Sequence, residues 1–362
     1  MTVRAEAVVD LDAVAHNVSV LKRAAGGAEV LAAVKADAYG HGAAVVAKTV
    51  LDAGATWLGV VLVEEGVALR NAGIDAPVLV MMEPPPGAAA AAKAFDLDLG
   101  VGSLDRLAEA VTCGTRVHLK ADTGLSRGGA LDFPALAEAA AKAEADGNLE
   151  VVGVWSHLAC ADAVGHPANA AQVARFEDAL RVAAAAGLRP RLRHLANSAA
   201  TLTMPEARYD LVRPGIAVYG LSPVAGETFG LRPAMTLRAR VAMTKRVPAG
   251  TGVSYGHRYV TPAETTLALV PIGYGDGVPR HATNTADVWL RGARRRISGT
   301  VCMDQFVVDC GDDAVEVGDE VVLFGPGEAG EPTAQDWADA LGTISYEIVT
   351  RIAPRVPRKY VP

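Results

Sequence analysis

The sequence lacks the features that direct a chain to nucleic acids or membranes. Its 362 residues carry a formal net charge of -7, with both signs scattered along the chain, so no basic stripe is present to follow a phosphate backbone. No apolar stretch approaches the length of a membrane span, and the first segment, MTVRAEAVVDLDA, reaches acidic residues before any signal-peptide core. We therefore expect a cytoplasmic protein that acts on small molecules, with neither a nucleic-acid nor a membrane partner.

Cysteine is also scarce. The four cysteines are widely spaced and lack the close pairs typical of zinc sites or disulfide scaffolds: Cys113, Cys160, Cys302 and Cys310. We expect buried free thiols and no metal. What is abundant is apolar: 51% of residues are hydrophobic and 21% are charged, as in folded globular proteins. A chain of this length favours roughly two domains.

The first part of the chain alternates short β-rich runs with longer Ala-rich segments of helical period, which is typical of repeated βα units. Eight runs predict an α/β fold, a (β/α)8 TIM barrel: near residues 30–34, 57–61, 77–81, 97–101, 116–119, 151–155, 192–194 and 209–212. We expect Asp12 to cap a helix that ends at Ala25, Asp132 with Pro134 to open another, and the Ala-rich residues 88–94 to form a packing helix.

The texture changes near residue 231 to short strands broken by Gly and Pro, which predicts a second, mainly β domain. We expect the barrel over residues 1–231 and the C-terminal β domain over 232–362. A strand near residues 4–9 is compatible with either domain.

Chemically useful residues follow five of the predicted barrel strands, at the ends where barrel enzymes place their catalytic groups. They are Lys35; Lys120 and Arg127; His157; Asn197 and Ser198; Arg213 and Gly215. A lysine at a strand end is usually just a solvated charge. Lys35, however, follows the apolar run LAAV, and desolvation in a barrel mouth lowers a lysine pKa and frees the amine as a Schiff-base nucleophile. Pyridoxal phosphate needs such an amine.

A phosphate group also needs a cradle, which barrels commonly build from the loops after strands seven and eight. Asn197-Ser198-Ala199 begins a helix whose N–H groups and hydroxyl suit a dianion, and Gly215 allows a close backbone approach. Taken alone, such a helix start is more often a simple capping device.

Several blocks of sequence, in order along nearly the whole chain, then point to a family: AVKADAYGHG, LKADTGLSRGG, HLACAD, HLANSAATL, VRPGIAVYG, VSYGHRY, PIGYGDGVPR, GTVCMDQFVVD and RVPRKYV. In these blocks the chain resembles the alanine racemases. The resemblance implies a pyridoxal-phosphate enzyme of fold type III that interconverts L- and D-alanine. It also implies a head-to-tail homodimer whose C-terminal domain contributes to the partner subunit's active site.

The resemblance assigns cofactor contacts to individual residues. Lys35 would hold the cofactor covalently, and the phosphate would be surrounded by Tyr39, Ser198, Gly215, Ile216 and Tyr346. Arg213 would face the pyridine nitrogen, to which a guanidinium can only donate. His157 and Arg213 would belong to a chain of groups behind the second catalytic base.

The same resemblance implies two bases, because a single group tends to return its proton to the face it came from. Lys35 would serve one face and Tyr255 of the partner subunit the other. The substrate carboxylate would meet Arg127 and the backbone of Met303.

Two sets of assignments leave alternatives open, and one segment departs from the family pattern. Lys120 is either carbamylated, as in some relatives, or an unmodified lysine. Tyr274 and Asp304 match residues of the family's substrate entryway, or they are plain interface residues. The Gly-Gly-Ala after Arg127 departs slightly from the family pattern near the carboxylate site.

Two other functions compete with alanine racemisation. A racemase of broader specificity, accepting for example serine, differs by only a few pocket contacts. A non-catalytic pyridoxal-phosphate carrier on the same barrel would lack the second domain and the opposite-face tyrosine, and this sequence has both. The sequence also leaves open whether the product supplies peptidoglycan or a specialised pathway.

Overall fold

The computed structural model describes residues 3–362, which group into two compact units. One unit contains residues 14–38 and 42–231, and the other contains residues 3–13, 39–41 and 232–362. The division after Leu231 coincides with the change of texture in the sequence. The first residues, in contrast, group with the C-terminal part of the chain.

The first unit is built on eight parallel strands in the order β8-β7-β6-β5-β4-β3-β2-β9. Their bounds are β2 Glu29–Ala33, β3 Trp57–Val60, β4 Val78–Val80, β5 Asp98–Val101, β6 Arg116–Lys120, β7 Glu150–Trp155, β8 Leu192–His194 and β9 Leu211–Val212. The two end strands approach each other and nearly close the barrel, since the residue before β9 donates a backbone hydrogen bond to β8, from Asp210 N to Arg193 O, 3.1 Å long. The predicted TIM barrel is confirmed, with all eight strands in the expected places.

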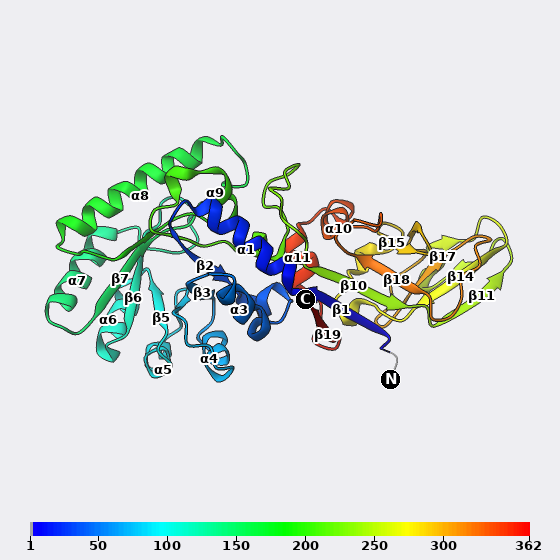
Figure 1. The fold of residues 1–362 in the computed structure, drawn as a ribbon, viewed down its shortest axis with the longest axis horizontal. Coiled ribbons are helices and arrows are strands. Elements are labelled where there is room, and N and C mark those ends of the chain that lie inside the picture. Colours follow the sequence, from blue (N-terminus) through cyan, green and yellow to red (C-terminus); the bar gives the residue numbers. More distant parts are fainter. Residues whose placement is uncertain (1–2) are drawn as a thin grey trace. The chain divides into compact units, whose positions relative to one another are not determined.

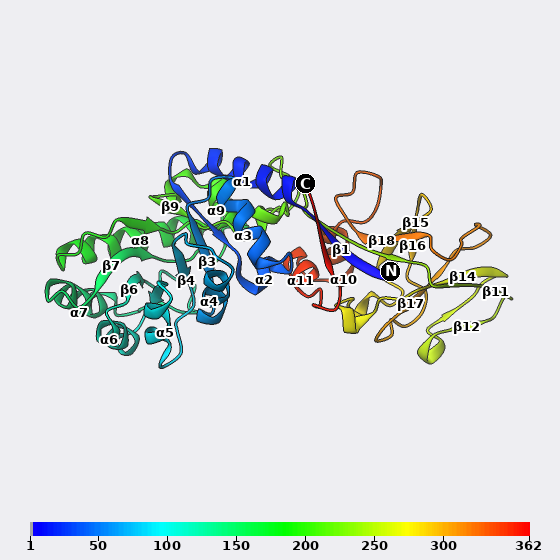
Figure 2. The same ribbon diagram turned by 60° about the horizontal axis from the view of Figure 1, so that its bottom comes forward.

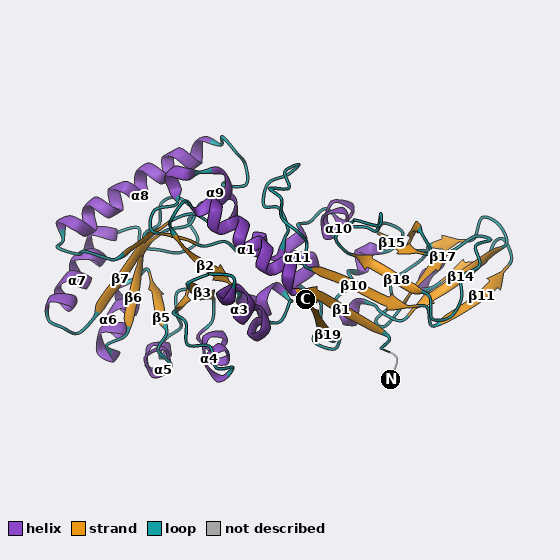
Figure 3. Ribbon diagram, viewed as in Figure 1, coloured by secondary structure: helices purple, strands orange, loops and turns teal. Residues whose placement is uncertain are grey.

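Helices α4 to α8 surround these strands on the outside (Figures 1 and 3). The helices along this part of the chain are α1 Leu11–Ala25, α2 Lys35–Tyr39, α3 Ala43–Asp52, α4 Val63–Asn71, α5 Ala88–Ala94, α6 Leu104–Cys113, α7 Phe133–Ala145, α8 Pro167–Ala185 and α9 Ser198–Thr203, with 3-10 turns η1 Pro205–Ala207 and η2 Ile216–Tyr219. Asp132 caps α7 as predicted. The predicted cap of α1 is wrong: Asp10, rather than Asp12, accepts from Ala13 N at 2.7 Å.

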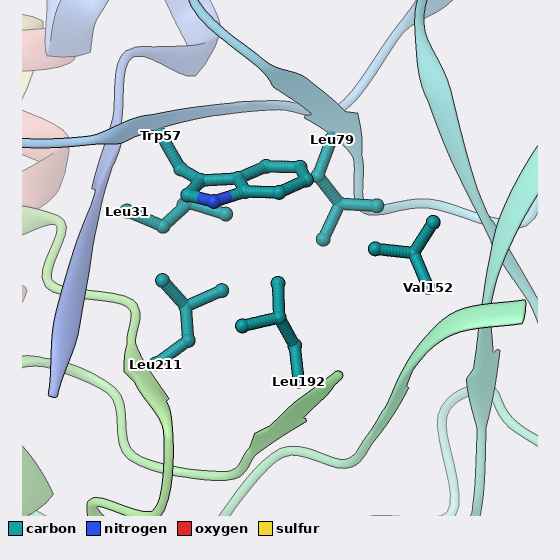
Figure 4. Close-up of a cluster of buried hydrophobic side chains, with 6 residues drawn as sticks. All are labelled: Leu31, Trp57, Leu79, Val152, Leu192 and Leu211. Atoms are coloured by element: carbon teal, nitrogen blue, oxygen red, sulfur yellow. The ribbon is translucent and has the colours of Figure 1, made fainter. Parts of the chain in front are cut away.

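The barrel interior is filled by apolar side chains from facing strands, as Figure 4 shows. The cluster consists of Leu31, Trp57, Leu79, Val152, Leu192 and Leu211, with Met81 packed against it. Each strand is short, so its inward-facing positions alternate over only two or three residues. The cluster therefore holds the strand ends that carry the functional residues at fixed positions.

The second unit is mainly β (Figure 3), as predicted. A six-stranded sheet runs in the order β16-β15-β18-β10-β1-β19, beside a three-stranded sheet β11-β14-β17 and the pair β12-β13. The elements are β1 Ala5–Asp10, β10 Met235–Arg240, β11 Met243–Val247, β12 Gly252–Val253, η3 Tyr255–His257, β13 Tyr259–Val260, β14 Thr265–Val270, η4 Tyr274–Asp276, η5 Arg280–Ala282, β15 Asp287–Leu290, β16 Ala293–Arg296, β17 Phe306–Asp309, β18 Glu320–Phe324, α10 Ala334–Leu341, α11 Ser345–Thr350 and β19 Arg358–Val361.

Strand β1 belongs to this six-stranded sheet, although its sequence pattern was compatible with either domain. It pairs antiparallel with β10 and parallel with β19, and lies between them (Figure 2). Its residues alternate between buried and partly buried, so one face packs in the core of the β unit.

The expected burial of the cysteine thiols is only partly confirmed. All four cysteines are free, but only Cys310 is fully buried, and the other three are partly exposed. Within residues 3–362, no helix combines the length and apolar character needed to cross a membrane.

Candidate active site

The predicted functional residues of the barrel follow its strands at their carboxyl ends. Lys35 lies two positions after the end of β2, Lys120 is the last residue of β6, and Arg213 follows β9 directly. His157 follows β7, and Ser198 begins α9 just after β8. The parallel order of the strands brings these ends to one face of the barrel.

Lys35 opens a turn of unusual conformation. Residues Ala36, Asp37 and Ala38 all have φ between 51° and 53° with ψ near 50°, which is the left-handed region that costs L-residues about 1–2 kcal/mol each. Surrounding hydrogen bonds hold the turn. Ala38 N donates to Val34 O at 2.9 Å, and Ala43 N donates to Asp37 Oδ1 at 2.8 Å.

Glu65 connects this turn to the next strand-helix loop. Its Oε1 accepts from Ala36 N at 2.6 Å, and its Oε2 accepts from Val61 N at 2.8 Å and from Leu62 N at 3.1 Å. The backbone on which Lys35 sits is thereby tied to the start of α4. Sequence reasoning missed Glu65, because a glutamate in the first turn of a helix is normally just a capping residue.

Electrostatically, the site is a cluster of cations. Burial lowers the pKa of Lys35, and the positive charge of Arg127 lowers it further, while Glu65 opposes the shift. Burial, then Arg213 and Arg127, lower the pKa of Lys120 to about 8. Burial and the same arginines hold the pKa of His157 well below its ordinary value. The site therefore favours neutral amines and attracts anionic ligands.

Arg213 is fixed by several acceptors. Its Nη2 donates to Ser156 O at 2.6 Å and to Leu195 O at 3.2 Å, and it lies 3.4 Å from His157 Nδ1. The guanidinium also lies over the Trp155 ring, 4.9 Å from its centroid. Burial lowers the pKa of Arg213 to about 9, which leaves it protonated at neutral pH.

The residues of the predicted phosphate cradle come together after β8 and β9. Ser198 Oγ accepts from Gly215 N at 2.8 Å and from Ala217 N at 3.4 Å, so Ser198, Gly215 and Ile216 form one buried backbone corner. Asn197, the other predicted residue of this cradle, caps α9, since its Oδ1 accepts from Ala200 N at 3.1 Å.

The β unit holds six of the predicted residues in two groups: Tyr39, Tyr255, Tyr274, Met303, Asp304 and Tyr346. Tyr39 and Tyr346 lie together, with ring centroids 6.3 Å apart. Burial raises the pKa of Tyr39, and Tyr346 adds to the shift, so the Tyr39 hydroxyl stays protonated and can donate.

The second group gathers Tyr255, Tyr274, Met303 and Asp304 on adjoining loops. Thr300 Oγ1 donates to Tyr255 O at 2.7 Å, and Gly275 N donates to Met303 O at 2.8 Å. The side chains of Tyr255, Met303 and Tyr274 are 73%, 54% and 42% exposed in the single chain.

Asp304, in contrast, is engaged in an ionic network. Its Oδ1 accepts from Arg355 Nη2 at 2.6 Å, and Arg355 Nε also donates to the fully buried Asp276 at 2.6 Å. Asp276 in turn binds Arg4 and the backbone of Gly273. The network anchors the loop that carries Tyr274.

Comparison with known proteins identifies the family. Residues 9–223 match the family model "Alanine racemase, N-terminal domain", and residues 234–360 match "Alanine racemase, C-terminal domain". The chain belongs to the alanine racemase family. The predicted resemblance is thus confirmed, as is the prediction of an enzyme, an isomerase that acts on amino acids.

Relatives cover the whole chain. The alanine racemase of Frankia casuarinae is 59% identical over 370 residues, covering 99% of this chain and 96% of the relative. That of Salinispora arenicola is 59% identical, covering 99% and 98%. The crystal structure of alanine racemase from D-cycloserine-producing Streptomyces lavendulae superposes with a TM-score of 0.98 at 49% identity, covering 100% of this chain and 98% of that one.

Proposed function

We propose that this member of the alanine racemase family interconverts L- and D-alanine with pyridoxal phosphate held on Lys35. One observation carries the proposal: the amine of Lys35, at the carboxyl end of β2, has a lowered pKa in a cluster of cations. A neutral amine is what bonds to an aldehyde, and the cations suit both a phosphate and an amino-acid carboxylate.

The donor groups of the site fit the cofactor. Ser198, Gly215 and Ile216 would hold the phosphate with Tyr39 and Tyr346, and Arg213 would donate to the pyridine nitrogen. When bound, pyridoxal phosphate makes the Cα–H bond of an amino acid acidic by spreading the negative charge left on Cα. Two backbone acceptors, Ser156 O and Leu195 O, hold the guanidinium of Arg213 in place, and it would give the ring nitrogen a hydrogen bond but no proton.

Lys35 and Tyr255 are the proposed pair of bases. Lys35 Nζ takes the Cα proton from one face or returns one to it, and Tyr255 of the partner subunit does the same on the other face. The exposure of Tyr255 in the single chain is compatible with a contribution to a second subunit. We accordingly propose a homodimer with shared active sites.

Substrate recognition follows from the remaining residues. Arg127 would bind the substrate carboxylate with the backbone of Met303 of the partner subunit, and Tyr274 and Asp304 would line the entryway. The lowered pKa of Lys120 favours the neutral amine that carbamylation requires. The proposal includes both the carbamylated and the unmodified state of Lys120. A cytoplasmic location and the supply of D-alanine, for peptidoglycan or a specialised pathway, belong to the same proposal.

A D/L-alanine interconversion assay with and without added pyridoxal phosphate tests cofactor, reaction and substrate together. We expect racemisation that depends on the cofactor, and borohydride reduction should leave the pyridoxyl group on Lys35. Trapping at any other lysine would refute the assignment. Comparing kcat/KM for L-Ala and L-Ser decides between the alanine racemase and the broader racemase, and absence of any turnover would favour the non-catalytic carrier.

Tyr255→Phe tests the second base. We expect a loss of roughly 100-fold or more in kcat, the contribution of a general acid-base group, with Tyr259→Phe as the matched tyrosine from the same segment. A Tyr255→Phe enzyme with the wild-type rate would remove Tyr255 from the mechanism.

A further inference from the structure

A chain of buried side chains crosses the barrel interior from the amino end of β5 to Arg213. Asp98 Oδ2 lies 3.2 Å from His118 Nε2, and His118 Nδ1 lies 2.8 Å from His194 Nε2. His194 Nδ1 then lies 3.1 Å from Arg213 Nη1. The four residues are between 0% and 4% exposed, so water does not substitute for these partners.

The groups at the two ends of this chain, a guanidinium that only donates and a carboxylate that only accepts, require one direction for every hydrogen bond between them. A guanidinium has no acceptor, so His194 Nδ1 must accept from Arg213 and His194 must carry its proton on Nε2. That proton faces His118 Nδ1, which must therefore accept, leaving the proton of His118 on Nε2, directed at Asp98. Burial and the charge of Arg213 lower the pKa of His194 well below its ordinary value, in keeping with a neutral imidazole.

Asp98 terminates the chain with a negative charge. Burial alone would raise the pKa of Asp98, but His118 and Arg116 together hold it below its ordinary value. Arg116 Nε donates to Asp98 Oδ1 at 2.7 Å. Within residues 3–362, Arg213 forms no direct ion pair with a carboxylate. The chain of hydrogen bonds instead connects it to the carboxylate of Asp98 through two imidazoles.

We propose that Asp98 is a positioning residue for Arg213, acting through His118 and His194. By accepting from His118, it fixes both imidazoles in the Nε2–H tautomer, and this keeps His194 Nδ1 as an acceptor for the guanidinium. The inference rests on the proposed function, in which Arg213 donates to the pyridine nitrogen of the cofactor.

Asp98→Asn breaks this arrangement because an amide has only one oxygen for two donors. If that oxygen faces Arg116, the amide N–H groups face His118, and both imidazoles must reverse their tautomers. His194 Nδ1–H would then face the N–H groups of Arg213. If the oxygen instead faced His118, the amide N–H groups would face the charged guanidinium of Arg116, so the first orientation is favoured because a charged donor makes the stronger hydrogen bond.

The chain offers a matched control in Asp96→Asn. Asp96 also accepts from Arg116, at 2.7 Å, but it is exposed and does not contact His118. Its φ of 52° suits asparagine, which tolerates the left-handed region. A loss caused only by weakening Arg116 would appear in both variants.

The experiment is ¹⁵N NMR of histidine-labelled full-length protein as purified, with resonances assigned residue by residue, together with kinetics. We expect both His118 and His194 as Nε2–H tautomers in the wild type and in Asp96→Asn, and a changed or mixed tautomer in Asp98→Asn. In Asp98→Asn, kcat should fall roughly 10- to 150-fold, the effect of losing a hydrogen bond to a charged group, with KM for alanine near the wild-type value.

Two outcomes would overturn the inference. One is a wild-type His194 that carries its proton on Nδ1, which needs no variant to be observed. The other is an equal loss of kcat in Asp96→Asn and Asp98→Asn. If the wild type instead shows no use of pyridoxal phosphate, the proposed function fails, while the tautomers of the wild type still decide the role of Asp98.

Discussion

Replacing Glu65 with Gln removes one of the two carboxylate oxygens that join the Lys35 turn to α4. Three consecutive residues of this turn, Ala36, Asp37 and Ala38, are left-handed and together store about 3–6 kcal/mol of backbone strain at about 1–2 kcal/mol each. The Ala36 N–H bond to Glu65, 2.6 Å long, has a charged acceptor, and such bonds contribute ~1.5–3 kcal/mol.

The Gln variant can keep the bonds to Val61 and Leu62 through one oxygen, but its amide N–H groups would then face the Ala36 N–H. Because this bond is exposed, water recovers part of the loss. We therefore expect the turn to open more easily by about 1–2 kcal/mol, which is a roughly 5- to 30-fold faster amide exchange.

Hydrogen-deuterium exchange with mass spectrometry on a peptide spanning residues 34–43 measures this directly. Glu64→Gln is the matched control, since Glu64 is the exposed neighbour of Glu65 on the same helix. We also expect slower racemisation in Glu65→Gln, because Lys35 is the first residue of the loosened turn and would be held less firmly. Exchange in Glu65→Gln at the wild-type rate would refute the reasoning.

Three further expectations concern the barrel interior. Gly153→Ala would place a methyl carbon against His118 Nδ1, and thermal unfolding should show a loss of roughly 1–3 kcal/mol, the usual cost of overpacking; an unchanged Tm would contradict the close approach. Leu79→Ala, at a fully buried position of the cluster in Figure 4, should cost about 2–5 kcal/mol in denaturant unfolding, and a loss below about 1 kcal/mol would mean that the core repacks. The pKa of Asp98 is lowered in the folded state, so its stabilisation is present above the unfolded-state pKa and is lost as pH falls. The difference in unfolding free energy between wild type and Asp98→Asn should accordingly shrink as the pH falls below about 4, and a difference that grows there would contradict the sign.

The sequence predicted the elements that depend on local patterns. The eight barrel strands are short apolar runs between Ala-rich helical segments, and each lies where its run predicts. The helix at residues 88–94 and the Asp132 cap were also predictable, because helix propensity and capping act within a few residues. The candidate site could also be predicted from the sequence, because residues that directly follow barrel strands converge by topology alone.

Tertiary structure decided what depends on distant partners. Strand β1 belongs to the β unit because it pairs with β10 and β19, which follow it by more than 200 residues in the sequence. The residue pattern of a strand does not indicate which distant strand it pairs with. The sequence did not predict the left-handed turn after Lys35 either, because its residues are ordinary L-residues, and backbone N–H groups that donate to the carboxylates of Glu65 and Asp37 hold the turn in place.

The sequence by itself determined the barrel, the β domain and the lysine at the barrel mouth, since hydrophobic periodicity and strand order suffice for these. Only the folded structure decided that Arg127 adds to the lowering of the Lys35 pKa, that the pKa of Lys120 is lowered as well, and that Arg213 is joined to Asp98 through two histidines. The physical reason is that burial, charge proximity and hydrogen-bond direction are properties of three-dimensional neighbours, which a linear pattern does not specify.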